Sequence, residues 1–250
     1  MTKDRITELI KQGRMMLRPN WSELNTKETP KGLGKDYPNI VKEYDKDSKI
    51  IKLKKEEIKN ISIKTLHEVI SSRRSLRKYK DIPLSMDQLS YLFYETSRLF
   101  KHTKSITFRA YPSGGATASL ETYVYINKVE GLEKGIYRYL PIPGDLLFLY
   151  NSSSLEDEVN EALSGQLRDG AVVFFWTAIP YRTEFKYSFT AHKMIAMEAG
   201  HTCQNLALAC EAIDFGAVAI SAYNQELCDK ALKVDGEDEF VIYLSVIGKK

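Results

Sequence analysis

The stretch AVVFFWTAI, residues 171–179, constrains the fold more than any other part of this chain. It is a short apolar run of β-branched and aromatic residues. Such a run is typical of a strand at the centre of a sheet that is covered on both faces. The chain has 250 residues, 43% of them hydrophobic, which is enough for one large domain with a sizeable core around this strand.

Further strands are predicted on both sides of this run. ETYVYIN (121–127), GIYRYLP (135–141) and DLLFLYN (145–151) are separated by Gly, Pro and Asn, which predicts an antiparallel meander. AVAISAY and EFVIYLSVIG, nearer the C-terminus, are predicted to be buried strands. Because strands do not alternate strictly with helices, we expect an α+β fold, a mostly antiparallel sheet flanked by helices.

The predicted helices divide the chain into two parts. Residues 1–17 have apolar residues at helical spacing, whereas residues 18–60 have no period and look like an extended arm. Compact structure is expected from Thr65, so we predict an arm over 1–64 and a domain over 65–250. Residues 191–216 predict a long helix that is apolar nearly all round, buried in the core or in a subunit interface.

Charge and cysteine content narrow the function classes. The formal net charge is only +3, whereas a nucleic-acid-binding protein is usually far more basic, so we expect no nucleic-acid partner. The three cysteines form no CxxC pair, and we expect buried free thiols in a reducing cytoplasm. The N-terminus lacks a secretory apolar core, and no apolar run is long enough to span a membrane. A cytoplasmic protein without a membrane partner is therefore expected.

The stretch SSRRSLRKYKDIP, residues 71–83, gathers positive charge around one serine. Its cations are Arg73, Arg74, Arg77, Lys78 and Lys80. Arginine binds phosphate in a bidentate manner, and a serine hydroxyl adds a neutral donor. If the segment is extended, Arg73, Ser75 and Arg77 point to one side, and Arg74 points to the other. The pattern fits an anion site or a solvated basic loop, and spacing alone does not decide between them.

Three other motifs are weaker. The paired glycines of YPSGGATAS (111–119) permit close approach of backbone to a ligand, or form an ordinary tight turn. Glu198 and His201 have the spacing of a di-iron ligand pair, but the motif occurs only once; we predict no metal, and a polar cluster that fixes helix packing. In FKYSF, Lys186 and Tyr187 are either an acid/base pair or two unrelated neighbours.

In this order, these segments resemble the nitroreductase-like flavoproteins. Within that family the chain is similar to the SagB-type dehydrogenases, which are themselves similar to thiazoline/oxazoline oxidases. The motifs that carry the resemblance are RRSLRKY (73–79), YPSGGATASLETYVYI (111–126), GLEKGIYRYLP (131–141), LSGQ (163–166), EAGHTCQNLALAC (198–210) and the C-terminal GEDEFVIYLSVIG. The resemblance implies an FMN-binding, domain-swapped homodimer with the flavin at the dimer interface.

The resemblance also implies roles for individual residues. The FMN phosphate and ribityl chain would contact Arg73, Arg74, Ser75 and Arg77. The isoalloxazine would contact Pro112, Ser113, Gly114 and Gly115 of the other subunit, Gln166, and the backbone of Ala219, Ile220, Ser221 and Ala222. Lys186 and Tyr187 correspond to the catalytic Lys-Tyr pair of the azoline-oxidising members. Whether Lys249 or Lys250 contacts the phosphate is left open.

The implied activity is that of an FMN-dependent oxidoreductase that transfers hydride through flavin N5. It would act as an NAD(P)H-driven reductase of nitro or quinone compounds, or as a dehydrogenase of a small heterocycle or a peptide. The SFTAHKM that follows Tyr187 replaces the arginine-rich continuation of the subgroup, which argues against a peptide azoline substrate. The alternative is a flavin-binding protein without turnover, acting as a carrier or as a scaffold in a peptide-modifying complex.

Overall fold

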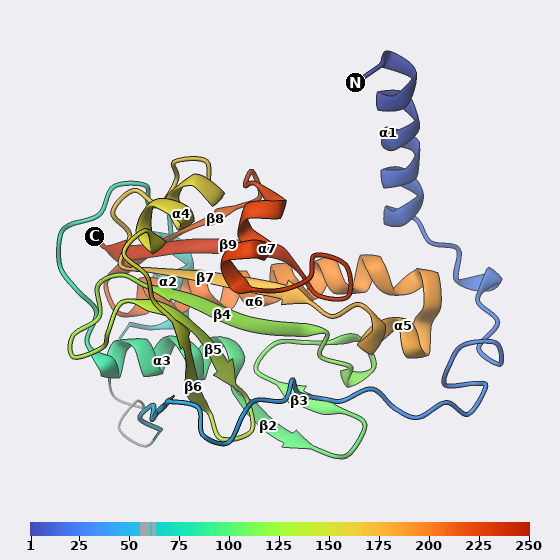
Figure 1. Cartoon of the computed structure of the whole chain (residues 1–250), viewed down its shortest axis with the longest axis horizontal. Helices are drawn as coiled ribbons and strands as arrows, with labels where there is room; N and C mark the ends of the chain where they lie inside the picture. The colour runs from blue at the N-terminus through green and yellow to red at the C-terminus, as the bar shows by residue number, and fades with distance from the viewer. Residues whose placement is uncertain (56–60, 62–63) are drawn as a thin grey trace.

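A seven-stranded sheet forms the centre of the molecule, as seen in the computed structural model, which describes residues 1–55, 61 and 64–250 (Figure 1). The strand order is β1-β6-β5-β4-β7-β9-β8, and every pair of neighbours is antiparallel. The strands are β1 Ile50–Ile51, β4 Leu120–Ile126, β5 Gly135–Leu140, β6 Asp145–Tyr150, β7 Val172–Ala178, β8 Phe215–Ile220 and β9 Phe240–Lys249. A separate ribbon pairs β2 Leu99–His102 with β3 Thr107–Arg109. The predicted α+β class and the β4-β5-β6 meander are confirmed.

Strand β7 lies between β4 and β9, and each of its residues is buried. Side chains alternate between the two faces of a strand. Phe174 and Trp176 accordingly belong to one hydrophobic cluster, and Val173 and Phe175 to another. The strand is therefore covered on both faces, as the apolar run predicts.

Helices cover both faces of the sheet (Figure 1). The helices of the described residues are α1 Lys3–Leu17, α2 Leu66–Ser72, α3 Met86–Ser97, α4 Leu155–Ala162, α5 Tyr181–Tyr187, α6 Ala191–Ala212 and α7 Gln225–Leu232. Helices α3 and α6 pack on the Phe174 face, whereas α4 and α7 pack on the Phe175 face. Capping boxes begin α2 at Thr65 and α3 at Ser85, which fixes where the chain turns into each helix.

Helix α6 is buried along one face. Ile195, Ala199, Cys203 and Leu206 point into the core at helical spacing. The opposite side of the helix, including Met197 and His201, is exposed in the single chain. The sequence predicted a helix that is buried on most sides. Burial of the exposed side by a partner subunit stays a prediction. The three cysteines are buried and free, as expected.

The N-terminal part begins with a helix that has no buried residue. Helix α1 projects from the domain (Figure 1) and approaches it at α6. The N-terminal arm, residues 18–55, then runs along the domain and ends beside β6, where β1 joins the edge of the sheet. Leu53 enters the core. The boundary predicted at residue 64 thus falls after the first strand, because the arm is partly built into the sheet. Among the described residues, no helix is long and apolar enough to cross a membrane.

Candidate cofactor site and active site

The basic segment, residues 73–80, is extended and lies along the sheet. The Leu76 amide donates to the Ala217 carbonyl at 3.1 Å, and the Lys80 amide donates to the Lys249 carbonyl at 2.9 Å. Two glycines allow this close approach, because a Cβ at Gly216 would collide with Leu76 and one at Gly248 with Tyr79. The extended conformation required for the predicted anion site is therefore present.

A small pocket of about 140 Å³ opens beside this segment. Arg73 and Ser75 line it together with Gly200 and Gln204 of α6 and with Ala219 of β8. The structure thus brings Arg73 and Ser75 together with Ala219, which is far from them in the sequence.

The other two predicted arginines lie outside the pocket lining. Arg74 folds back, and its Nη1 donates at 2.9 Å to the carbonyl oxygens of Ser71 and Arg73. Arg77 is exposed to solvent. Both residues are exposed, and their predicted contact with the cofactor stays a prediction.

The cations of the basic segment have no acidic partner within the described part of the chain. The acidic groups at the end of α6 are taken by other lysines. Lys250 lies 2.5 Å from Glu211, and Asp214 lies 3.0 Å from Lys64 and 3.7 Å from Lys249. Lys249 and Lys250 are thus paired with protein carboxylates, unlike the cations of the basic segment.

A second cluster forms around residues 110–120, which carry the paired glycines. Three polar residues of α6, one helical turn apart, lie against this segment. Asn205 Nδ2 donates to the Ala110 carbonyl at 3.2 Å, and His201 Nδ1 lies 3.4 Å from the Pro112 carbonyl. Glu198 is buried beneath Ser113, and this burial raises its pKa to about 7. The polar cluster predicted from the EAGH motif thus fixes the glycine segment on α6.

Lys186 and Tyr187 contact the same glycine segment from the other side. They end helix α5 and do not lie on a loop. Lys186 Nζ donates to the Gly115 carbonyl at 2.9 Å. Gly115 has a positive φ of 62°, and a Cβ there would collide with the Tyr187 phenol oxygen. The structure therefore joins the predicted Lys-Tyr pair and the predicted Pro112–Gly115 segment in one cluster, which is consistent with the proposed roles of both.

Gln166 follows α4 in the sequence and lies beside the end of β8 in the structure. Its Nε2 donates to the Ala222 carbonyl at 2.8 Å and to the Leu163 carbonyl at 3.1 Å. Ile220 is buried in the core, whereas Ser221 and Ala222 are exposed beyond the strand. Gln166 and the 219–222 strand end are thus neighbours, and the backbone there is accessible.

Sequence reasoning missed the part that the N-terminal arm plays at this cluster. The Trp21 ring lies 5.9 Å from the Tyr187 ring, at an interplanar angle of 72°. The Lys31 amide donates to the Phe185 carbonyl at 3.0 Å. Burial lowers the pKa of Lys186, and the charge of Lys31 lowers it further. The available signal was a lone tryptophan within a polar, proline-containing arm.

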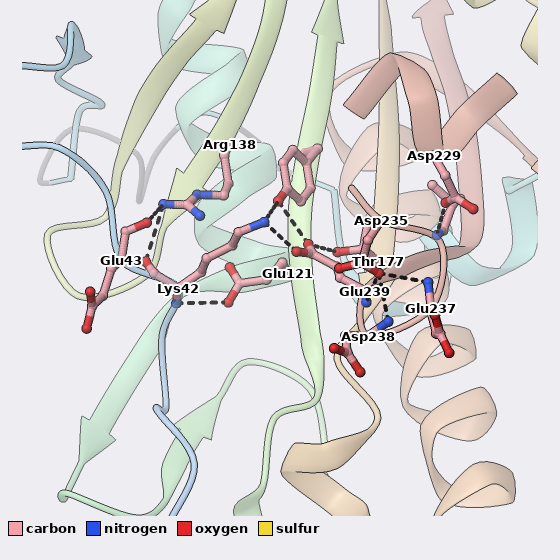
Figure 2. Close-up of polar contacts among 12 residues, drawn as sticks. Lys42, Glu43, Glu121, Arg138, Thr177, Asp229, Asp235, Glu237, Asp238 and Glu239 are labelled. Carbon is pink, nitrogen blue, oxygen red and sulfur yellow. Dashed lines mark hydrogen bonds and ion pairs between the residues drawn. The ribbon is translucent and has the colours of Figure 1, made fainter. Parts of the chain in front are cut away.

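A network of buried charges fixes the arm to the sheet; we call it the anchor network. It consists of Lys42, Glu121, Tyr123, Arg138, Thr177, Arg182 and Glu239 (Figure 2 labels Lys42, Glu121, Arg138, Thr177 and Glu239). Lys42 forms an ion pair with Glu239, which also accepts from Tyr123 at 2.9 Å and from Thr177 at 2.7 Å. Arg182 pairs with Glu121 at 2.7 Å, and both side chains are nearly inaccessible. The arm is therefore held next to α5.

Comparison with known proteins identifies the family. The sequence model of the Nitroreductase family matches residues 70–249. This range contains the basic segment, the glycine segment, the Lys-Tyr pair and the end of β8. The chain therefore belongs to the nitroreductase family, and the family expected from the sequence is confirmed.

Individual relatives agree with this assignment. "Putative nitroreductase MJ1384" of Methanocaldococcus jannaschii is 29% identical over 186 residues, which is 74% of this chain and 91% of that protein. A solved nitroreductase-like structure from Anabaena variabilis is 26% identical, with a TM-score of 0.61. The match covers 72% of this chain but only 37% of that longer chain.

One solved structure also matches the N-terminal part. A chain of the Escherichia coli microcin synthetase McbBCD complex, solved with truncated pro-MccB17 bound, gives a TM-score of 0.60 at 17% identity. The match covers 100% of this chain and 94% of that chain. This similarity shows a shared fold that includes the region of the arm.

Proposed function

We propose that this protein is an FMN-dependent oxidoreductase of the SagB-type dehydrogenase kind, with hydride passing through flavin N5. The observation that carries the proposal is the basic segment, in which Arg73 and Ser75 line a pocket and have no acidic partner among the described residues. The FMN phosphate carries a charge near −2 at neutral pH, which such a donor set neutralises. Each charged hydrogen bond would contribute about 1.5–3 kcal/mol.

The residues present fit FMN only if a second subunit completes the site. The pocket of about 140 Å³ is smaller than the roughly 300 Å³ at which ligand pockets begin. It accommodates a phosphate and part of a chain, but a flavin ring needs a second wall. The exposed side of α6 and the Pro112–Gly115 segment would supply that wall in a homodimer, with an interface on the order of 2,000 Å².

Lys186 and Tyr187 are the residues that we propose for proton transfer. Bound FMN supplies the hydride acceptor or donor, and this chain supplies the proton and the geometry. Among the described residues, Lys186 Nζ donates one hydrogen bond, to Gly115, so its other donor positions are open to a substrate oxygen or nitrogen. The phenol of Tyr187 lies against Gly115 as well, so the two groups contact the same residue of the glycine segment. The substrate would be NAD(P)H together with a small acceptor, or a reduced heterocycle.

The test begins with identification of the flavin. Acid extraction of the purified protein and chromatography should yield FMN; FAD, or no flavin after reconstitution, would contradict the proposal. Bleaching of the bound flavin by NAD(P)H or by an oxidisable heterocycle would demonstrate turnover. A flavin that no such donor reduces would leave the carrier or scaffold alternative.

The catalytic pair is tested by a matched substitution. Tyr187→Phe should slow flavin reduction or reoxidation by roughly 10²–10⁴-fold with FMN binding intact, because it removes a positioned acid/base group. Tyr181→Phe is the control, since Tyr181 begins the same helix and is exposed. Equal rates in both variants would remove Tyr187 from the mechanism.

A further inference from the structure

We propose that the N-terminal arm forms one wall of the substrate site, and that Trp21 is a specificity-determining residue for flat aromatic or quinonoid rings. The inference rests on the proposed function in one respect: the substrate side of the site lies at Lys186 and Tyr187. It adds a role for a part of the chain that lies before the residues matched by the family.

The arm is fixed against α5 by several independent contacts. Tyr37 packs on Phe185 with ring centroids 4.8 Å apart. Arg182 Nε donates to the Asn39 carbonyl at 3.0 Å. The Lys31 amide donates to the Phe185 carbonyl at 3.0 Å, and Thr29, two residues earlier in the arm, is only 3% exposed. These contacts hold residues 29–39 on α5, so the preceding residues approach Tyr187 from a defined direction.

Trp21, in this preceding part of the arm, lies against Tyr187. It begins a short 3-10 turn, Trp21–Glu23, whose N-cap Asn20 accepts from the Ser22 amide. The indole is 50% exposed, although it is the largest apolar side chain of the arm. Its edge-to-face contact with Tyr187 leaves indole surface open beside the proposed acid/base group.

The surroundings favour a flat ring that carries an acceptor oxygen. Lys186 Nζ lies 6.0 Å from the Tyr37 ring centroid, so an ammonium and two aromatic side chains of the arm surround the end of α5. A planar ring that stacks on the indole would place a carbonyl or nitro oxygen within reach of an ammonium. Glu184 of the same helix is paired with His192 at 2.7 Å, so this carboxylate already has a partner.

The first experiment compares two oxidants of the reduced, FMN-loaded protein. In the reaction with 2-methyl-1,4-naphthoquinone, two electrons and two protons pass to the quinone, which gives the hydroquinone and oxidised flavin. Ferricyanide takes the same two electrons in two one-electron steps and has no ring to stack. Trp21→Leu should slow reoxidation by the naphthoquinone about tenfold, as expected for a lost ring contact, and leave the ferricyanide rate unchanged.

Tyr44→Leu is the matched control for this comparison. Tyr44 is an exposed aromatic residue of the same arm, beyond the anchor at Lys42. It should leave both rates unchanged. Equal slowing of both oxidants in Trp21→Leu, or no slowing of either, would overturn the inference, because a purely structural role does not distinguish a ring from an inorganic ion.

A second readout needs no flavin. The chain has two tryptophans, and Trp176 is fully buried, so quenching of tryptophan fluorescence by the naphthoquinone reports on Trp21. We expect saturable quenching of the apoprotein that Trp21→Leu abolishes; linear collisional quenching would contradict the inference. Saturable quenching in a protein that binds no FMN would contradict the proposed function but would still support the role of Trp21 in ring binding.

Discussion

The anchor network and the basic segment hold charge in opposite ways. In the anchor network, Lys42, Arg182, Glu121 and Glu239 are paired with one another or with hydroxyl groups. In the basic segment, Arg73 and Arg77 have no acidic partner within the described residues, and like charges lie side by side. Buried charges must be paired because desolvation is costly, whereas exposed like charges only repel one another weakly.

The difference separates charges that build the fold from charges that are available to a ligand. Removing one member of a satisfied buried pair leaves the other uncompensated, so the anchor network should be sensitive to substitution. Removing an exposed, unpaired arginine should leave stability unchanged and affect only the binding of an anion. The following predictions, all for the apoprotein, are ordered by the expected change in unfolding free energy.

The largest effect is expected at the buried Arg182–Glu121 pair. Arg182→Met should lower the unfolding free energy by about 3–5 kcal/mol, because Glu121 would stay buried without its partner. Urea denaturation measures this change. In the double variant Arg182→Met/Glu121→Leu, much of the loss should be recovered. A double variant no more stable than Arg182→Met would show that packing, and not the uncompensated charge, causes the loss.

An intermediate effect on the unfolding free energy is expected at Glu198. Its side chain is buried, but one oxygen, Oε1, has no hydrogen-bond partner among the described residues. Burial raises its pKa from 4.5 to about 7, so the folded protein binds more protons than the unfolded chain between these values. Its contribution to stability is therefore fully present below pH 4.5 and is lost as pH rises through 7, by roughly 3 kcal/mol. Subtracting the pH profile of Glu198→Gln from that of the wild type isolates this slope.

Glu211, on the same helix, should change stability with pH in the opposite direction. Burial opposes its ionisation, but hydrogen bonds from Lys250 and Ser72 lower its pKa. Its contribution should be present above pH 4.5 and be lost as pH falls. A Glu198→Gln difference that rises with pH, as the Glu211→Gln difference should, would contradict the assignment of Glu198.

The glycine segment should show a smaller effect. Gly115→Ala would suffer both a positive φ and a collision with Tyr187, at a cost of about 2–3 kcal/mol. Gly165→Ala also has a positive φ, but nothing lies within 4 Å of its added Cβ, so about 1 kcal/mol is expected. Thermal unfolding of both variants gives the difference. Equal losses would mean that the contact between Gly115 and Tyr187 does not constrain the segment.

The smallest change is expected in the basic segment. Arg77→Met should alter the unfolding free energy by less than about 0.5 kcal/mol, or raise it slightly at low salt, because the side chain is exposed among like charges. Denaturation at low and high ionic strength measures this. A loss above 1 kcal/mol would show that Arg77 has a structural partner and would break the distinction between the two regions.

The sequence predicted the sheet well because its signals are local. The run at 171–179, the meander and the long helix each carry a period or turn residues that act within a few positions. The basic segment carries no such signal, so its extended conformation was only a condition for the anion site and not a prediction. Which sides of α6 are buried could not be predicted, because an apolar pattern does not show what covers each side of a helix.

The tertiary contacts of the site could not be predicted from such patterns. Arg182 and Glu121 are 61 positions apart, and Lys186 contacts Gly115 across 71 positions. The clue to the anchor network was a charged residue at the start of an otherwise apolar strand, Glu121 in LETYVYI. The path of the arm had no local signal, since contacts such as that between Trp21 and Tyr187 depend on the finished fold.

The central claim is that the unpaired cations of the basic segment bind the FMN phosphate. Calorimetric titration of the apoprotein with FMN and with riboflavin, which lacks the phosphate, tests it directly. FMN should bind more tightly than riboflavin. Arg73→Ala should weaken FMN binding by about 1.5–3 kcal/mol and leave the affinity for riboflavin unchanged. Equal affinities of the wild type for FMN and riboflavin, or equal losses for both ligands in Arg73→Ala, would contradict the account.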